Sequence, residues 1–290
     1  MEPPTLFGGI TDIGGRRFVW GERTYVMGVI NVTPDSFSND GVGSNVDAAV
    51  RLAAKFQEDD ADIIDVGGES TRPPGIYGDS KPVTVDEELS RVLPMIEAIS
   101  RETDLPVSVD TYKAAVAKAA IEAGASMIND VWALQRDPEM LRVAADADVP
   151  VVLMHNQVGT EYDDLVPDMI GDLRERVNVA LIGGVRPEHL IVDPGMGFGK
   201  TAEQNLEILR RLYEFQELGL PLLVGMSRKS TIGYVLGLSV KDRVEGTAAT
   251  VALSIAGGAD IVRVHDVKEM ARVARMTDAV VRGWSQDDAG

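Results

Sequence analysis

Short apolar runs alternate with longer amphipathic stretches along most of the chain. The first clear run, Tyr25–Ile30, stops at Asn31, and the Thr33-Pro34-Asp35-Ser36 stretch beyond it predicts a turn, because proline fixes its own φ angle and cannot donate to a sheet. Apolar residues then recur at helical spacing from Val46 to Phe56. A buried strand that ends in a polar side chain and is followed by such a helix is typical of α/β enzymes.

The same strand-and-helix unit is predicted seven more times. Thr84, with Glu87 three residues later, has the spacing of a capping box and marks the start of the second helix. The predicted strands cover residues 25–30, 63–66, 106–109, 126–128, 149–154, 190–192, 222–224 and 261–262. The predicted helices cover residues 46–56, 84–99, 113–123, 139–147, 168–182, 203–218, 246–256 and 268–281.

Eight such units in 290 residues predict an α/β fold, a (β/α)8 TIM barrel that forms a single domain over residues 1–290. Glycine pairs between short apolar stretches add a small N-terminal hairpin within residues 1–22, which we expect to close the bottom of the barrel. A doubly wound open sheet is the alternative. It is disfavoured because such a sheet concentrates its ligands at one switch point, whereas polar residues here follow all eight strands.

Charge and composition narrow the function. A formal net charge of −18 disfavours binding to nucleic acid or to an anionic membrane, because phosphates require a basic face. One anionic small substrate needs only a few local cations and is not excluded. The chain has no cysteine, which excludes disulfides and thiolate metal sites. No run approaches the roughly 20 apolar residues of a membrane span and no secretion signal opens the chain, so we expect a cytoplasmic protein.

Polar residues at the predicted strand ends form the candidate site, because the carboxyl ends of barrel strands meet at one mouth. Asp110, Asn129 and Asp193 can offer hydrogen-bond donors and acceptors to the edge of a flat heterocycle. Asn31 and nearby acids offer oxygen ligands of the kind that Mg²⁺ prefers. Cations at the same ends suit a phosphorylated ligand. They are Arg72, Lys229, Arg263 and His265.

Each of these residues also has a simpler structural interpretation. An aspartate or asparagine after a strand is often a turn or helix cap, and His155 can be a hydrogen-bonded interior histidine. The glycines of Gly195–Gly199 lack the spacing and the later acid of a dinucleotide site. The Ala-rich helix within Gly246–Gly258 is most simply a packing or subunit-interface helix. Polar groups at all eight strand ends are much harder to attribute to coincidence than any one alone.

Eight sequence blocks spread between Tyr25 and Val281 carry a family resemblance. They are GVINVTPDSFS (Gly28–Ser38), DVGGESTRP (Asp65–Pro73), SVDTYK (Ser108–Lys113), IND (Ile128–Asp130), LMH (Leu153–His155), DPGMGFGKT (Asp193–Thr201), GMSRKS (Gly225–Ser230) and RVHDV (Arg263–Val267). In this order they resemble the dihydropteroate synthases, a family of pterin-binding enzymes. The pair NVTPDSFS and GGESTRP is the most specific part of the match.

The resemblance implies a transferase of folate biosynthesis that condenses 6-hydroxymethyl-7,8-dihydropterin diphosphate with p-aminobenzoate. The products would be 7,8-dihydropteroate and pyrophosphate. The family also implies a TIM barrel, a Mg²⁺ cofactor, small-molecule substrates without nucleic acid or membrane, and a homodimer.

The family's site residues carry over to matching positions in this chain. The pterin would be held by Asp110, Asn129, Asp193 and Lys229, with Met154 against its ring. Arg263 and His265 would bind the diphosphate, with Asn31 on the metal. The p-aminobenzoate pocket would be formed by Phe37, Thr71, Arg72, Phe198 and Ser230. The catalytic residues would be Asp110, Lys229, Arg263, Thr71 and Arg72.

The chemistry suits these residue types. Cleavage of the pterin C–O bond leaves a cationic methylene group and places negative charge on pyrophosphate, which Mg²⁺, Arg263 and His265 would stabilise. Asp110 would stabilise the cation. The carboxylate of p-aminobenzoate would lie at the amino end of the helix after Lys229.

Two stretches depart from the family pattern, and two other functions stay open. Asn39-Asp40 displaces an acid by one position, and Pro73–Val83 is longer than the usual loop. One alternative is a methyltetrahydrofolate-dependent pterin methyltransferase, which has no need for diphosphate-binding cations. The other is a non-catalytic pterin-binding paralogue, which would be expected to lose loop residues such as Phe37 and Thr71, both present here.

Overall fold

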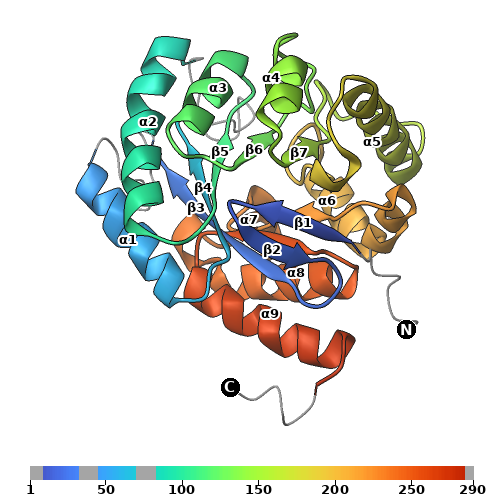
Figure 1. Ribbon diagram of the computed structural model, residues 1–290. Helices are drawn as coiled ribbons and strands as arrows, with labels where there is room; N and C mark the ends of the chain where they lie inside the picture. Colours follow the sequence, from blue (N-terminus) through green and yellow to red (C-terminus); the bar gives the residue numbers. More distant parts are fainter. Residues whose placement is uncertain (1–8, 33–44, 70–82, 285–290) are drawn as a thin grey trace.

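The computed structural model describes residues 9–32, 45–69 and 83–284, and within them eight parallel strands form a ring (Figure 1). Their order is β8-β7-β6-β5-β4-β3-β10-β9, and a parallel bridge between Val192 and Leu222 joins β8 to the chain just before β9. The predicted (β/α)8 barrel is therefore confirmed. The strands are β3 (Tyr25–Asn31), β4 (Ile63–Gly67), β5 (Val107–Asp110), β6 (Met127–Asp130), β7 (Val151–Met154), β8 (Leu190–Asp193), β9 (Leu223–Val224) and β10 (Ile261–Val264).

Helices surround the ring and cover its outer face (Figure 1). Each predicted helix has a counterpart among α1 (Val46–Glu58), α2 (Val85–Glu102), α3 (Ala114–Glu122), α4 (Met140–Ala147), α5 (Leu165–Ile182), α6 (Ala202–Arg210), α8 (Val244–Ala256) and α9 (Val267–Val281). At α2, Thr84 accepts a hydrogen bond from the Glu87 amide, as predicted, but the Glu87 carboxylate pairs with Arg91 instead of returning to the cap.

Two helical segments differ from the sequence prediction. The single helix expected over residues 203–218 ends at Arg210, and a 3-10 helix, Leu212–Leu218, follows. Leu212 and Phe215 are buried three residues apart, which matches the three-residue turn of a 3-10 helix. A short extra helix, α7 (Ser230–Leu236), lies between β9 and α8 and ends at Gly237 with a φ of +68°. Two further 3-10 turns span Pro187–His189 and Val240–Asp242.

The predicted N-terminal hairpin is confirmed and closes one end of the barrel. Its strands, β1 (Ile10–Ile13) and β2 (Arg16–Val19), pair antiparallel and lie within the ring of helices in Figure 1. Ile13, Phe18 and Trp20 pack directly on a layer of side chains inside the barrel. That layer consists of Met27, Ile63, Met127, Val152, Ile191, Leu223 and Ile261.

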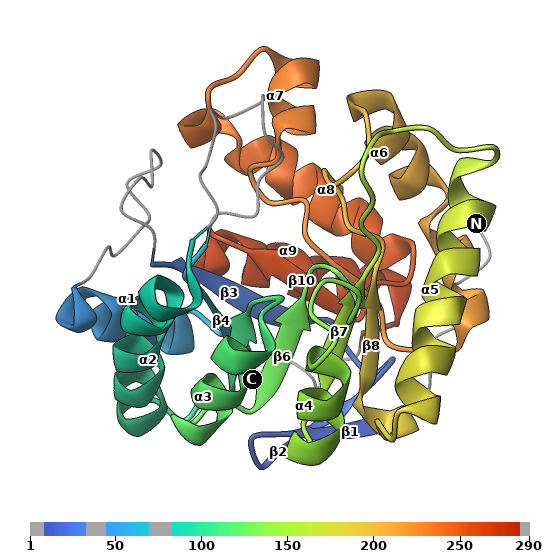
Figure 2. The same cartoon turned by 90° about the horizontal axis from the view of Figure 1, so that it is seen from above.

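The three hairpin residues and this layer of side chains together form an apolar plug at one end of the barrel. A polar layer follows the plug toward the other end of the barrel, because side chains on a strand alternate between its two faces. On each strand, the side chain two residues after the plug residue again points into the barrel. It lies nearer the end opposite the hairpin, where α7 is seen in Figure 2. On four strands this step leads from an apolar residue to a polar one. The pairs are Ile63 and Asp65, Met127 and Asn129, Ile191 and Asp193, and Ile261 and Arg263.

The helices carry no membrane-spanning signature. Across residues 9–32, 45–69 and 83–284, none is both long and apolar enough to cross a bilayer.

Candidate active site

Arg263 on β10 is the centre of the polar layer. Its Nε donates to Asp65 Oδ2 over 2.6 Å, and its Nη2 donates to Asp110 Oδ2 over 2.7 Å. Asn129 Nδ2 donates to the same Asp65 oxygen over 3.0 Å. Four strands, β4, β5, β6 and β10, therefore contribute to one hydrogen-bonded cluster, and the predicted convergence of Asp110, Asn129 and Arg263 is observed.

Asp110 has unused capacity to bind a ligand. Burial raises the pKa of its carboxyl group above the ordinary value, and the Arg263 guanidinium lowers that pKa again. Oδ1 of Asp110 is buried and has no hydrogen-bond partner among the described residues. An unpaired acceptor in a buried site is costly, so a ligand N–H group bound there would be stabilising.

Asp193 is held by the turn that follows β8. Its Oδ1 accepts a hydrogen bond from the Gly195 amide over 2.7 Å. Burial raises the pKa of Asp193 to about 6, while this amide and the charge of Lys229 act in the opposite direction. Gly195 has a φ of +68°, and a Cβ added there would lie 2.0 Å from the His155 carbonyl oxygen. The glycine is required because neither the conformation nor the space tolerates a side chain.

Lys229 and Phe198 meet at the same mouth. The Lys229 ammonium lies 4.4 Å from the centre of the Phe198 ring, within the range of a cation–π contact. The turn that presents Lys229 is fixed by Arg243, whose Nη1 donates to the carbonyl oxygens of Arg228 and Lys229 over 2.9 and 3.3 Å. Ser230, partly exposed, begins α7 immediately afterwards.

The remaining predicted residues divide into two groups. Met154 ends β7 and is buried, and His265 follows β10 with its ring within hydrogen-bond distance of Ser227. Asn31 ends β3 and is partly exposed. Phe37, Thr71 and Arg72 lie outside the described residues, as do Asn39-Asp40 and nearly all of the long stretch that ends at Val83.

Sequence and structure comparisons agree on the family. The model for pterin binding enzymes matches residues 27–265. A dihydropteroate synthase from Clostridium beijerinckii is 52% identical over 271 residues, which cover 93% of this chain and 99% of the relative. The structure of the Xanthomonas albilineans dihydropteroate synthase with 4-aminobenzoic acid superposes with a TM-score of 0.87 at 43% identity, covering 94% of this chain and 98% of the other. That of the Yersinia pestis dihydropteroate synthase with a sulfonamide drug gives a TM-score of 0.89 at 39% identity, covering 95% and 100%.

The chain belongs to the dihydropteroate synthases, within the pterin-binding enzyme family. It is therefore a transferase, as the sequence blocks indicated.

Two residues at the mouth of the barrel could not be predicted from the strand ends alone. Asp65 lies in the middle of β4 and is fully buried. A charged residue within an apolar strand is rarely buried without a partner, and that signal could have identified it. Lys200 is 7% exposed, and its ammonium donates to His155 Nδ1 and to the carbonyl oxygens of Gly195 and Phe198 over 3.0, 3.1 and 2.7 Å.

Lys200 thus ties the turn after β8 to the end of β7. Burial lowers its pKa to about 7, and burial together with the Lys200 charge lowers the pKa of His155 to about 3. His155 is therefore a neutral, hydrogen-bonded interior histidine, the simpler of the sequence interpretations. Through Lys200, His155 is linked to the turn after β8, and Asp193 and Phe198 lie on either side of Gly195 in that turn.

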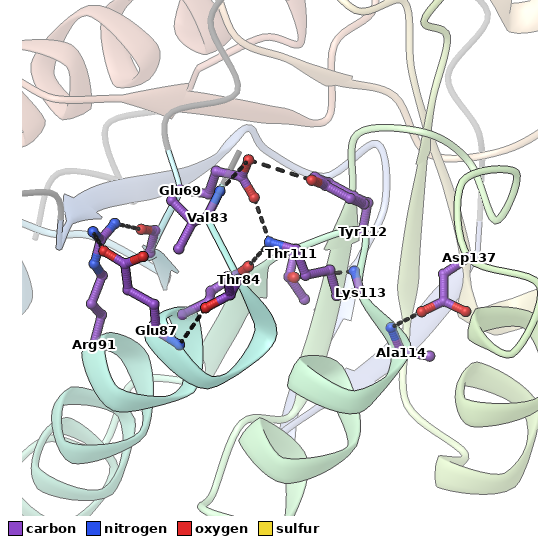
Figure 3. A network of polar contacts seen from close by, with 12 residues as sticks. Glu69, Val83, Thr84, Glu87, Arg91, Thr111, Tyr112, Lys113, Ala114 and Asp137 are labelled. Atoms are coloured by element: carbon purple, nitrogen blue, oxygen red, sulfur yellow. Dashed lines mark hydrogen bonds and ion pairs between the residues drawn. The ribbon is translucent and has the colours of Figure 1, made fainter. Parts of the chain in front are cut away.

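A second ionic cluster lies where β4 ends (Figure 3). The Lys113 ammonium lies 2.5 Å from a Glu69 carboxylate oxygen and also pairs with Glu88, which is 1% exposed. Tyr112 donates to the other Glu69 oxygen over 3.3 Å, and the Val83 amide approaches that oxygen at 3.4 Å. This cluster joins the end of β4 to the first turn of α2 and to Lys113, the N-cap residue of α3.

A cavity of about 550 Å³ lies along the β7–α5 connection. It is lined by Trp132, His155, Tyr162 and several acids of the β7–α5 connection and α5. None of the predicted substrate-binding residues lines it.

Proposed function

We propose that the polar layer of the barrel holds the pterin substrate while this chain catalyses the reaction of its family. That reaction condenses 6-hydroxymethyl-7,8-dihydropterin diphosphate with p-aminobenzoate and yields 7,8-dihydropteroate and pyrophosphate. The observation that carries the proposal is the Arg263 guanidinium shared between Asp65 and Asp110, beside a buried Asp110 oxygen that has no partner among the described residues.

The pterin is bound by groups that complement the edge of a flat heterocycle. Asp110 and Asp193 accept hydrogen bonds from ring and amino N–H groups, and the Asn129 carboxamide offers both a donor and an acceptor. Lys229 contributes a donor from the next strand end, and Met154 packs on the ring. The two buried carboxyls and Asn129 are 8%, 6% and 3% exposed, so a bound ring would be largely excluded from water.

The reaction separates charge, and the residues are suited to each part. The bond between the pterin methylene carbon and the diphosphate oxygen breaks, and its electron pair leaves with pyrophosphate. The Asp110 carboxylate stabilises the cationic carbon, and the p-aminobenzoate nitrogen then bonds to that carbon and loses a proton. Arg263 retains Nη1 hydrogens without a partner among the described residues, and these would bind the diphosphate together with His265.

Five residues are proposed to form the p-aminobenzoate pocket. Phe198 and Ser230 lie at the mouth next to Lys229, which supports their assignment. Phe37, Thr71 and Arg72 lie outside the described residues, and the family resemblance supports their assignment to this pocket.

The residues present fit a Mg²⁺ ion that is held mainly by substrate. Within the described ranges, no three His, Asp or Glu side chains gather into a metal site. Mg²⁺ nevertheless binds many proteins through one or two oxygens and completes its shell with water and phosphate. The Asn31 carboxamide at the end of β3 would supply such an oxygen. When bound, the ion would neutralise charge on the leaving pyrophosphate.

We further propose a cytoplasmic homodimer of a single domain spanning residues 1–290. Support for the dimer comes from exposed apolar side chains on α7 and α8, two helices in contact. Tyr234, Val235 and Leu236 are 67%, 59% and 47% exposed, and Leu253 is 56% exposed. Exposed apolar side chains on neighbouring helices commonly mark an interface. Light scattering after gel filtration would test it, with Leu253→Lys expected to yield monomers.

The deciding experiment is pyrophosphate release from the pterin diphosphate, with and without p-aminobenzoate and Mg²⁺. Release that requires both, and that falls at least a hundredfold in Lys229→Ala, supports the proposal. Lys118→Ala is the control, because Lys118 is exposed on α3. Pterin binding without release would instead support a non-catalytic paralogue, and methyl transfer from methyltetrahydrofolate would support the methyltransferase.

A further inference from the structure

Asp65 contacts two site residues through one oxygen. Its Oδ2 accepts from Asn129 Nδ2 over 3.0 Å and from Arg263 Nε over 2.6 Å. Asp65 is fully buried, and its second oxygen has no partner in the described part of the chain. It follows Ile63 of the apolar plug by two residues, so it lies inside the barrel and directly below the mouth.

We infer that Asp65 is a positioning residue that sets which way the Asn129 carboxamide faces in the pterin site. An ionised carboxylate only accepts hydrogen bonds, so the Asn129 NH₂ group must face Asp65. The Asn129 carbonyl oxygen is thereby directed away from Asp65 and is available as an acceptor. Without Asp65 the amide can turn by half a circle at little steric cost, because its two ends have nearly the same shape. The turned amide would present a donor where the pterin requires an acceptor.

The same carboxylate fixes the Arg263 guanidinium. Asp65 and Asp110 bind its Nε and Nη2, so both carboxylates lie along one edge of the planar group. The Nη1 end is left for the substrate. A guanidinium bound at two points keeps its plane and its reach, whereas a single ion pair would allow rotation. Asp65 therefore acts on both the heterocycle and the diphosphate without contacting the reacting atoms.

Substitution at Asp65 separates positioning from a merely structural role. Both hydrogen bonds reach one oxygen, so Asp65→Asn keeps an acceptor at that point, while Asp65→Ala removes it. We expect the KM for the pterin diphosphate to rise about tenfold or more in Asp65→Ala and about threefold or less in Asp65→Asn. The KM for p-aminobenzoate should be unchanged in both variants.

The control is Ser108→Ala. Ser108 is the partner of Asp65 on the neighbouring strand, is equally buried, and has no hydrogen-bond partner for its hydroxyl among the described residues. Its loss should leave both KM values unchanged. A structural role alone predicts a lower melting temperature for Asp65→Ala with an unaltered pterin KM at a temperature where the variant is folded, and that result would overturn the inference.

A double-mutant cycle with Asn129 tests the route of the effect. If Asp65 acts through the amide, Asp65→Ala should weaken pterin binding less in an Asn129→Ala background than in the wild type. Fully additive effects would contradict the inference. The inference rests on the proposed pterin-binding role of Asn129, and the two can fail separately. An Asn129→Ala variant with wild-type pterin affinity refutes the proposed role, whereas weak binding by Asn129→Ala and normal binding by Asp65→Ala refutes only the part assigned to Asp65.

Discussion

Ser227 binds His265 at two points, once through the backbone and once through the ring. Its Oγ accepts from the His265 amide over 3.1 Å and lies 3.0 Å from the ring Nδ1. Because the amide occupies an acceptor position, the hydroxyl hydrogen can be donated to a neutral ring. A protonated ring would instead donate from Nδ1. When Nδ1 accepts from Ser227, or when the ring is protonated, Nε2 carries a hydrogen, which suits a histidine that binds an anionic diphosphate.

Ser227→Ala should therefore lower kcat/KM for the pterin diphosphate about tenfold, because the ring loses a hydrogen bond that orients it. Initial rates with p-aminobenzoate at saturation would measure it. Ser254→Ala is the matched control, since Ser254 is 1% exposed and its hydroxyl donates within α8 over 2.7 Å. Equal losses in the two variants would argue against a specific role for Ser227.

Replacement of Lys113 by methionine should destabilise the fold. The change leaves the Glu69 and Glu88 carboxylates close together without their shared cation, and Glu88 is almost wholly buried. Breaking a buried ion pair in this way commonly costs about 3–5 kcal/mol of unfolding free energy. Urea unfolding would measure the loss.

Arg142→Met provides the comparison for Lys113. Arg142 pairs with Glu139 at a surface position where both side chains are more than half exposed, so we expect a loss of about 1 kcal/mol or less. Adding Glu88→Gln to Lys113→Met should restore part of the stability, because it removes one of the two unpaired charges. A Lys113→Met variant as stable as Arg142→Met would show that the cluster contributes little.

The acid limb of the pH–activity profile should lie at a higher pH than the ordinary pKa of an aspartate would give. Asp193 must be ionised to accept from the pterin, and burial raises its pKa to about 6. Burial also raises the pKa of Asp110, which must be ionised to stabilise the cation. Below its pKa each group carries a proton and loses that role. The expected profile of kcat/KM for the pterin diphosphate declines below about pH 6, whereas a limb centred near pH 4 would contradict this assignment.

Trp20→Ala should reduce stability without altering substrate affinity. Trp20 is 2% exposed, packs against Tyr25 at 5.4 Å between ring centres, and donates from Nε1 to Thr11 over 2.9 Å. Truncation of a buried tryptophan commonly costs about 3–5 kcal/mol. The KM values should stay unchanged, because the hairpin closes the end of the barrel opposite the mouth. Trp284→Ala, at a residue 60% exposed, should have little effect on either property.

Much of the fold could be predicted because its signals are local. The β-strands appear as short apolar runs, the helices as segments with helical spacing, and the hairpin as glycine pairs between apolar stretches. The exceptions arise where a local signal is ambiguous. The residues of 203–218 have apolar positions compatible with one helix, yet burial of Leu212 and Phe215 three residues apart favours a 3-10 segment after Arg210.

The residues of the candidate site that lie at strand ends could be predicted from the sequence, whereas those placed by other contacts could not. Asp110, Asn129, Asp193 and Arg263 end or follow apolar runs, so the barrel geometry alone brings them together. Lys200 was missed because it follows a glycine-rich turn, and its acceptors are assembled only when that turn folds back on the end of β7.

By itself, the sequence determined the order of strands and helices, the family and most of the polar groups at the mouth. The tertiary structure alone decided how those groups pair. Asp65 and Arg263 are 198 residues apart in the chain, and they meet because closure of the barrel places β4 and β10 on either side of β3. No local pattern encodes that contact, since it depends on the register between strands and on which face of each strand turns inward.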